Sequence, residues 1–201
     1  MYQRGERQIY GIHFPDGLRQ NQKLPATIIT PTTKAFGGGH DEPLTPAEIT
    51  GRGLLTHEQW ATVSGLALGL FERGRAIAEQ HDLILVDTKY EFGLDEAGRV
   101  VLADEIHTPD SSRYRIGQSY EHRFAAGQPP ESLDKDFVRR WVTARCDPYR
   151  EPIPPIPREI IADAARLYIE AYETITGAVI VPPDPAIPVL DRIRANLATY
   201  F

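Results

Sequence analysis

The chain has little cysteine and no extended apolar run. Cys146 is the single cysteine among 201 residues, so the sequence offers neither an internal disulfide nor a Cys-x-x-Cys pair for zinc. This usage is typical of a reducing compartment, and we expect a cytoplasmic location. No apolar stretch approaches the roughly 20 residues that span a membrane, and residues 1–7 show no apolar signal region. We therefore do not expect a membrane protein.

Positive charge is also scarce. The chain has 22 Lys and Arg against 28 Asp and Glu, for a net charge of −6, and no basic stripe. A nucleic acid is therefore not an expected partner. A small anionic substrate stays open, because a few local cations can override the overall balance. Hydrophobic residues (41%) and charged residues (25%) are present in the proportions of a globular protein.

Several segments have the apolar periodicity and the end signals of helices. A Thr with Glu or Gln three residues later begins two of them, at Thr45 and at Thr56. Pro157 opens another, which Gly177 ends. The main predicted helices cover 57–80, about 133–145, 158–176 and a short segment near 189–197.

The clearest β signal is a hairpin. Residues 83–92 are predicted as one strand, 95–98 as a turn and 99–106 as the return strand. Residues 107–131 are predicted as a long loop. With helices packed around this small antiparallel sheet, the sequence predicts an α+β fold.

The hairpin carries a set of charged residues. Asp87, Lys89 and Glu91 share one face of the strand, because side chains alternate along it. A two- or four-residue turn pairs Lys89 with Asp104 and brings Asp104 to that face, whereas a three- or five-residue loop puts Asp104 on the other. Two interpretations stay open. The cluster is an ordinary solvent-facing side of a sheet, or its carboxylates hold Mg²⁺ together with phosphate oxygens.

Several stretches match, in order, the motifs of one enzyme family. The longest, Leu85-Val86-Asp87-Thr88-Lys89-Tyr90-Glu91-Phe92-Gly93, lies on the predicted hairpin. The others are Pro15-Asp16-Gly17-Leu18, Thr30-Pro31-Thr32-Thr33-Lys34 with His40-Asp41-Glu42, Ala103-Asp104-Glu105 with Thr108-Pro109-Asp110-Ser111-Ser112-Arg113, and Asp134-Lys135-Asp136-Phe137-Val138-Arg139. The sequence thus resembles SAICAR synthetase (phosphoribosylaminoimidazole-succinocarboxamide synthase) from about residue 5 to its end.

The resemblance implies an ATP-dependent ligase of purine biosynthesis. In that reaction ATP phosphorylates the carboxylate of carboxyaminoimidazole ribonucleotide (CAIR), and the amine of L-aspartate then displaces the phosphate to give SAICAR. ATP and Mg²⁺ are the implied cofactors, and CAIR and L-aspartate are the implied substrates. Such chemistry requires a closed, dry site, because water would destroy the acyl phosphate.

The resemblance also implies roles for particular residues. Glu91 and Asp104 would bind Mg²⁺ and, through it, ATP. Asp87 and Lys89 would be catalytic residues that contact the imidazole ribonucleotide or the transferring group. The implied substrate-binding residues are Lys34, His40, Asp41, Ser111, Ser112, Arg113, Lys135 and Arg139.

Members of this family have two lobes in an ATP-grasp- or kinase-like arrangement. We expect residues 1–26 to be a connector from an N-terminal lobe that this sequence lacks, and residues 27–201 to be the C-terminal catalytic lobe. The implied partner is a separate first lobe, or a second copy through the exposed lobe interface. The chain alone is expected to be nearly inactive. A truncated, non-catalytic nucleotide-binding or regulatory module stays open as the alternative function.

Overall fold

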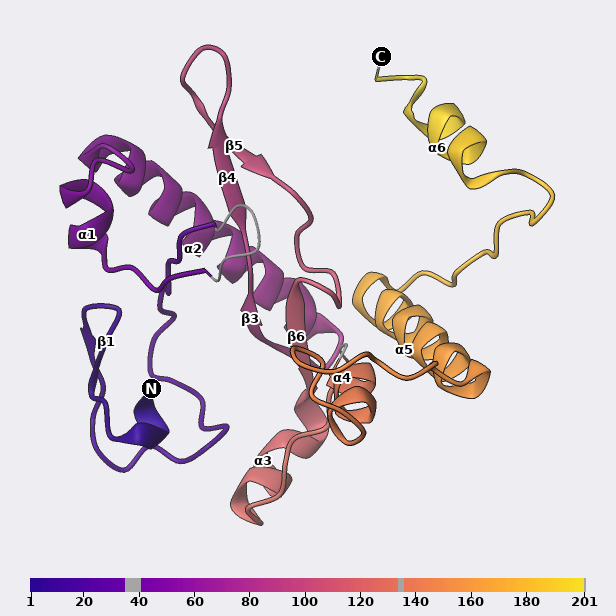
Figure 1. Ribbon diagram of the computed structural model, residues 1–201, viewed down its shortest axis with the longest axis horizontal. Coiled ribbons are helices and arrows are strands. Elements are labelled where there is room, and N and C mark those ends of the chain that lie inside the picture. Colours follow the sequence, from indigo (N-terminus) through magenta and orange to yellow (C-terminus); the bar gives the residue numbers. More distant parts are fainter. Residues whose placement is uncertain (35–40, 134–135, 201) are drawn as a thin grey trace.

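The computed structural model describes residues 1–34, 41–133 and 136–200 and has the predicted α+β architecture (Figure 1). Its helices are η1 (Tyr2–Arg4), α1 (Pro46–Gly51), α2 (His57–Gln80), α3 (Gly117–Ala125), α4 (Asp136–Thr143), α5 (Arg158–Thr176) and α6 (Val189–Leu197). Its strands are β1 (Gln8–Ile9), β2 (Ile12–His13), β3 (Leu83–Thr88), β4 (Glu91–Leu94), β5 (Val100–Ala103) and β6 (Ser112–Ile116). In the described residues these strands form three two-stranded antiparallel sheets, β1 with β2, β3 with β6 and β4 with β5.

The helix predictions from local end signals are confirmed. The Thr56 side chain accepts a hydrogen bond from the N–H of Gln59, whose side chain accepts one from the N–H of Thr56. Thr45 and Glu48 make the same reciprocal pair at α1. These bonds satisfy N–H groups that the first turn of a helix leaves without a helical partner. Gly177 adopts a φ of 68° and ends α5.

The single strand predicted over 83–92 is wrong, because this segment forms two strands with different partners. β3 pairs with β6 as far as Thr88 opposite Ser112, and β4 pairs with β5 starting with Glu91 opposite Ala103. Between them the N–H of Lys89 donates to the carbonyl oxygen of Ser111 at 3.1 Å. Figure 1 shows β4 continuing the direction of β3, so Lys89 lies where two sheets meet.

The predicted register of the hairpin is also wrong. Leu94 pairs with Val100 instead of Arg99, so the loop between β4 and β5 is 95–99 rather than 95–98. Strand pairing therefore does not place Asp104 opposite Lys89, as a four-residue turn would have done.

The side chain of Asp95 accounts for the longer loop. Its Oδ1 accepts hydrogen bonds from the N–H groups of Ala97 at 3.0 Å and Arg99 at 2.8 Å. Gly98 takes a φ of 76°, which a glycine adopts without steric cost. Asp commonly closes turns by bonding to the backbone ahead of it, and here that bonding adds one residue to the loop.

The long loop predicted over 107–131 is wrong, because the segment contains β6 and α3. The polar side chains of β6 alternate with only two apolar ones, Tyr114 and Ile116, so the strand has little apolar signal of its own. α3 begins at Gly117, where a Cβ would lie 2.9 Å from the backbone oxygen of Asp82. The N–H of Gly117 donates to that oxygen at 2.7 Å, so the close approach requires glycine.

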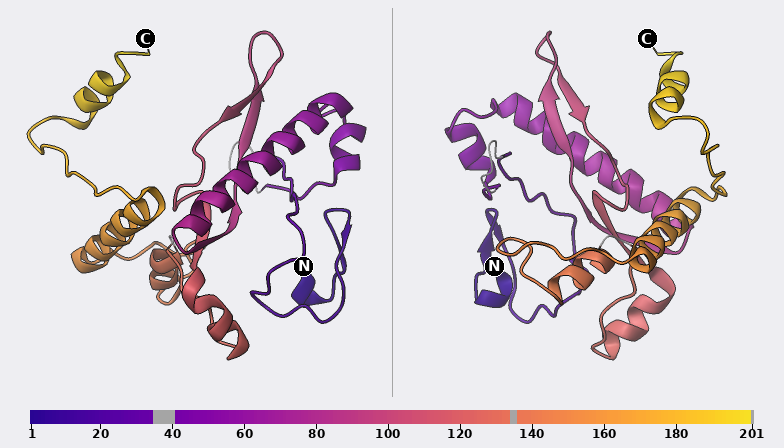
Figure 2. Two further views of the ribbon diagram at one scale, coloured as in Figure 1. Left: turned by 180° about the vertical axis from the view of Figure 1, so that it is seen from behind. Right: turned by 45° about the vertical axis from the view of Figure 1, so that its right-hand side comes forward.

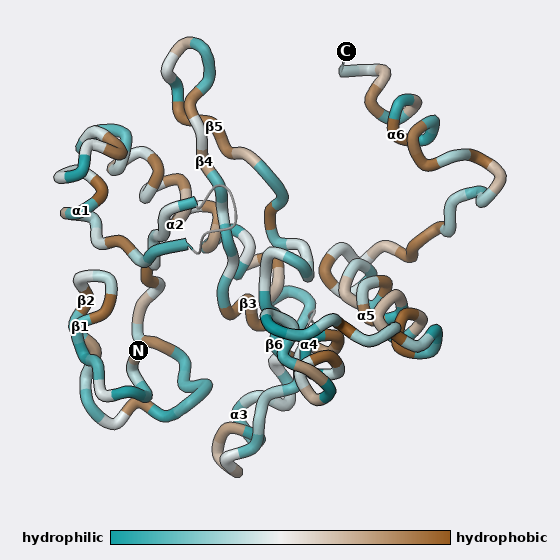
Figure 3. Tube along the Cα trace, in the orientation of Figure 1, coloured by the Kyte–Doolittle hydropathy of each residue, from teal (hydrophilic) through white to brown (hydrophobic). Residues whose placement is uncertain are grey.

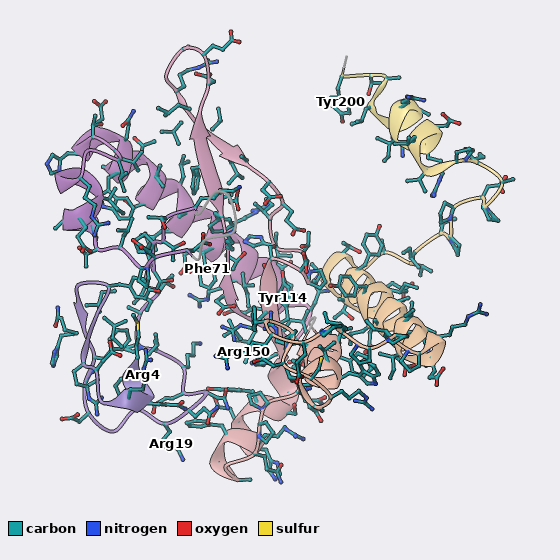
Figure 4. All side chains as sticks on the ribbon, viewed as in Figure 1. Arg4, Arg19, Phe71, Tyr114, Arg150 and Tyr200 are labelled. Carbon is teal, nitrogen blue, oxygen red and sulfur yellow. The ribbon has the colours of Figure 1, made fainter. Side chains whose placement is uncertain are left out.

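The core forms around Tyr114, which is 1% exposed. Figure 2 shows α2 crossing one face of the β3–β4 ribbon, and Figure 4 places Phe71 of α2 and Tyr114 of β6 near this crossing. The buried cluster consists of Ala78, Leu83, Leu85, Tyr114, Leu133 and Ala171. It joins α2, β3, β6 and α5.

Residues 19–23 pack on α3. The N–H of Lys23 donates to the Tyr120 hydroxyl at 3.1 Å, and that hydroxyl donates to the carbonyl oxygen of Asn21 at 2.8 Å. The guanidinium of Arg19 stacks on Phe124, 4.0 Å from its ring centroid. The division into a connector over 1–26 and a lobe over 27–201 stays a prediction.

The C-terminal helix α6 stands apart from the rest of the molecule (Figures 1 and 2). Apolar residues mark both the helix and the segment leading to it (Figure 3), and Val181 and Leu190 are 83% and 64% exposed. Among the described residues, none of the helices has the length and apolar character to cross a membrane.

Candidate functional site

A pocket of about 460 Å³ opens at the β3–β4 junction. Most of the predicted site residues line it: Asp87, Lys89, Glu91, Asp104, Ser111, Ser112, Arg113 and Arg139. A larger groove of about 1510 Å³ adjoins it, because Asp87, Lys89 and Glu91 line both, and the groove is also lined by Lys34 and Asp41. The predicted residues His40 and Lys135 lie outside the described residues.

Glu91 lies between two lysines at the start of β4. Its Oε1 accepts a hydrogen bond from Nζ of Lys89 at 2.8 Å, and its Oε2 accepts one from Lys34. The bond from Lys34 and then that from Lys89 hold the pKa of Glu91 below its usual value. The bond to Glu91 raises the pKa of Lys89, against the opposing effect of burial. Glu91 is therefore an ionised carboxylate at the pocket, bonded to two ammonium groups.

Asp104 reaches the same pocket by its backbone conformation and not by strand pairing. β5 ends at Ala103, and Asp104 adopts a φ of 68°, in the left-handed region. Strand alternation stops there, so the side chain of Asp104 lines the pocket together with Glu91. The charges of Asp41 and Asp104 add to the rise in the pKa of Lys89.

Asp87 and Arg113 are directly opposite each other on β3 and β6. Nε of Arg113 lies 2.9 Å from Oδ1 of Asp87, and Nη2 donates to Oδ2. Both side chains are about half exposed, so solvent screens the pair and it adds little to stability. Its consequence is geometric, because a two-pronged bond fixes the plane of the guanidinium at the pocket.

Hydroxyl groups hold β3, β6 and the preceding loop together. Ser112 is 3% exposed, and its Oγ donates to Oγ1 of Thr88 at 2.8 Å. In the loop, Oγ1 of Thr108 donates to the Glu105 carboxylate and accepts from the N–H of Ser111 at 3.3 Å. Ser112 therefore ties the two strands together at the floor of the pocket.

Four further residues line the pocket that received no role from the sequence: Thr30, Thr88, Glu105 and Asp110. Each stands in a motif that supplied other site residues. For Glu105 and Asp110, the sequence signal is the density of acidic and hydroxyl side chains over 104–112.

The donor set suits Mg²⁺ only when a ligand supplies further oxygens. In residues 1–34, 41–133 and 136–200, no group of three or more His, Cys, Asp or Glu is arranged to hold a metal. Mg²⁺ in nucleotide sites takes one or two carboxylates plus phosphate oxygens and water. Glu91 and Asp104, which both line this pocket, match that smaller requirement.

The sequence of this chain matches the model of a known protein family. The model of the family described as SAICAR synthetase matches residues 2–156. The chain belongs to the SAICAR synthetase family. A Legionella pneumophila protein named phosphoribosylaminoimidazole-succinocarboxamide synthase is 53% identical over 201 residues, covering 100% of this chain and 64% of that protein. A Mesorhizobium japonicum protein with the provisional name phosphoribosylaminoimidazole-succinocarboxamide synthase 2 is 61% identical over 200 residues, also covering 100% and 64%. The chain thus spans 64% of the length of these curated relatives.

Solved SAICAR synthetase structures share the fold. The enzyme from Saccharomyces cerevisiae, solved with SAICAR, is 36% identical with a TM-score of 0.70, and the match covers 86% of this chain and 54% of that one. A type-2 SAICAR synthetase solved with ADP is 27% identical with a TM-score of 0.60, and the match covers 82% and 57%. The predicted α+β class and its relation to SAICAR synthetase are thereby confirmed.

Proposed function

We propose that this chain is the C-terminal catalytic lobe, residues 27–201, of a SAICAR synthetase that joins L-aspartate to CAIR through an acyl phosphate. The observation that carries the proposal is the pocket in which two carboxylates, Glu91 and Asp104, lie beside the cations Lys89 and Arg113. Phosphoryl transfer to a carboxylate brings several negative charges together. Its rate depends on a divalent cation and on positive groups that are already in place.

Each side of the pocket has a proposed part in this reaction. Glu91 and Asp104 hold Mg²⁺ and, through it, ATP; the ion supplies positive charge against the phosphate oxygens when bound. Lys89, hydrogen-bonded to Glu91, is placed to offset charge on the transferring group. Asp87 orients Arg113 through the bond between β3 and β6.

The remaining predicted residues are proposed to bind the substrates. Arg113 suits the phosphate of CAIR or a carboxylate of aspartate, because a guanidinium grips either with two parallel bonds. Arg139 lines the same pocket from α4, and Lys34 and Asp41 line the adjoining groove. Ser111, Ser112, His40 and Lys135 complete the proposed substrate set.

The complete reaction is proposed to need more than this chain. An acyl phosphate must be shielded from water, which closure over a site achieves. We propose that a further lobe, on a longer chain or a separate one, closes this pocket, and that residues 1–26 connect to it. Without it, turnover should be very low, since losing a single preorganised donor already costs about 10²–10³ in rate.

The test is ADP release with CAIR, aspartate and Mg²⁺-ATP. One sample is this chain. The other is a chimera that adds the part of the Legionella pneumophila relative that this chain does not cover. The chimera should turn over, and Glu91→Gln or Asp104→Asn should abolish its activity. Robust turnover by this chain alone would refute the need for a second lobe. An inactive chimera that still binds Mg²⁺-ADP would favour the non-catalytic module, and one that does neither would refute the proposal.

A further inference from the structure

His107 lies in the middle of the loop from Asp104 to Ser111 and packs directly on helix α2. A Cβ at Gly74 would lie 2.3 Å from Cε1 of the His107 ring and 2.7 Å from both ring nitrogens. Carbon atoms do not approach so closely, so the ring fits only because residue 74 is glycine. Two other glycines of α2, Gly65 and Gly69, have no atom within 4 Å of the same position.

Two tyrosines hold His107 from its other sides. Its Nε2 lies 2.5 Å from the hydroxyl oxygen of Tyr90, and the two rings meet edge to face with centroids 5.6 Å apart. The carbonyl oxygen of His107 accepts a hydrogen bond from the hydroxyl of Tyr114 at 2.7 Å. Tyr114 belongs to the buried core. The middle of the loop is therefore fixed to α2, to the β3–β4 junction and to the core.

The loop needs such support because its backbone is unfavourable. Asp104 and His107 adopt φ values of 68° and 57°, which residues with side chains rarely take. Residues in these conformations persist when surrounding contacts over-determine them. The loop also carries four residues that line the pocket: Asp104, Glu105, Asp110 and Ser111.

We propose that His107 is a positioning residue for the pocket. Its ring, seated against Gly74 and bonded to Tyr90, sets the path of the loop so that Asp104 and Glu105 line the pocket together with Glu91. The inference rests on the proposed function in one respect only, namely that Asp104 and Glu91 serve Mg²⁺-nucleotide binding. The placement of the loop is independent of it.

Hydrogen–deuterium exchange of the full chain tests the placement. Gly74→Ala and His107→Ala should each speed exchange in residues 104–111 by about tenfold or more, since local opening follows the loss of buried contacts. Exchange in β3 should change little, which shows that the variants fold. Gly69→Ala is the matched control on the same helix and should leave the loop unchanged.

A double variant tests the contact itself. Once His107→Ala has removed the ring, Gly74→Ala should have no further effect on exchange in the loop, because residues in contact are not additive. Additive effects of the two substitutions, or a Gly74→Ala pattern equal to that of Gly69→Ala, would overturn the proposal.

Titration calorimetry with Mg²⁺-ADP tests the role in positioning. His107→Ala and Gly74→Ala should weaken binding by about 10- to 100-fold, the usual effect of removing a group that orients metal ligands. His107→Gln should retain most of the affinity, because its amide nitrogen can reach Tyr90. Unchanged affinity despite faster loop exchange would overturn the proposal. The same titration is run on the chimera with the added lobe. If neither this chain nor the chimera binds Mg²⁺-ADP, the proposed function fails, while the exchange pattern still decides whether His107 sets the loop.

Discussion

Nζ of Lys89 lies 2.8 Å from Oε1 of Glu91, across the break between β3 and β4. The residue between them, Tyr90, bonds instead to His107 on the other side of the chain. Successive side chains at this junction therefore point to opposite sides. Lys89 and Glu91 point into the charged pocket, and Tyr90 points to His107 in the 104–111 loop. Changes to either side are open to separate tests.

Glu91→Gln should remove the Mg²⁺ dependence of ADP binding. A neutral amide is a poor ligand for Mg²⁺ and cannot hold the two ammonium groups of Lys34 and Lys89 as an ionised carboxylate does. Calorimetry with and without Mg²⁺ measures the effect. Glu96→Gln is the control, since Glu96 is exposed in the β4–β5 loop. Equal Mg²⁺ dependence in both variants would contradict the assignment of Glu91 to the metal.

Arg113→Lys should weaken the binding of SAICAR although it keeps the charge. A lysine cannot reproduce the two-pronged bond to Asp87, so its ammonium group is not held in the orientation that binds a ligand carboxylate or phosphate. Competition against a fluorescent nucleotide measures the affinity. Arg99→Lys makes the same change in the exposed ion pair with Asp95, outside the lining of the pocket. If the two variants bind alike, Arg113 has no part in the substrate site.

Acid should destabilise the protein through His107. Burial lowers the pKa of His107 below its usual 6.5, so near that pH the unfolded chain binds the proton more readily than the folded one. The stability that depends on neutral His107 is fully present above about pH 6.5 and is lost as the pH falls through the lower, folded pKa. Burial raises the pKa of Tyr90 to about 12, so its hydroxyl stays neutral throughout this window.

Urea unfolding at a series of pH values between about 7.5 and 5.5 checks this expectation. The midpoint should fall towards the acid end in the wild type and more gently in His107→Gln. Parallel curves for the two proteins would show that other groups cause the pH dependence.

Thr56→Ala should destabilise the fold by about 1 kcal/mol, because it removes the side-chain acceptor that caps the first turn of α2. Thr62→Ala is the control within the same helix. Its hydroxyl bonds only to the carbonyl oxygen of Glu58 at 3.0 Å, so its loss should change stability by less than about 0.5 kcal/mol. An equal loss of stability in the two variants would show that capping by Thr56 is not the cause of the destabilisation.

Features of the fold that depend on residues close together in the sequence could be predicted. The start of α2 follows from Thr56 with Gln59 and the end of α5 from Gly177, because these residues act within one turn of themselves. The register of the β4–β5 hairpin failed because Asp95 bonds to the backbone ahead of it. No apolar pattern records that bond.

Non-local pairing accounts for the other failures. β6 has few apolar residues and owes its extended form to β3, which lies far from it in sequence. Asp87, Lys89 and Glu91 line one pocket, and their grouping could be predicted because they share a single stretch of chain. Asp104 lines the same pocket because its backbone is in the left-handed region, and strand alternation does not predict that conformation. The contact of His107 with Gly74 carried no sequence signal, because it forms only when α2, the β3–β4 junction and β6 are packed together.

That contact also restricts how the two positions evolve. A ring at 107 excludes any side chain at 74, whereas a small residue at 107 tolerates glycine or alanine at 74 alike. Mutational paths are therefore ordered: His107 has to shrink before residue 74 grows, and the reverse order passes through a clash. Relatives of this chain with histidine at position 107 should therefore have glycine at position 74. Relatives with a larger residue at position 74 should have a small residue at position 107.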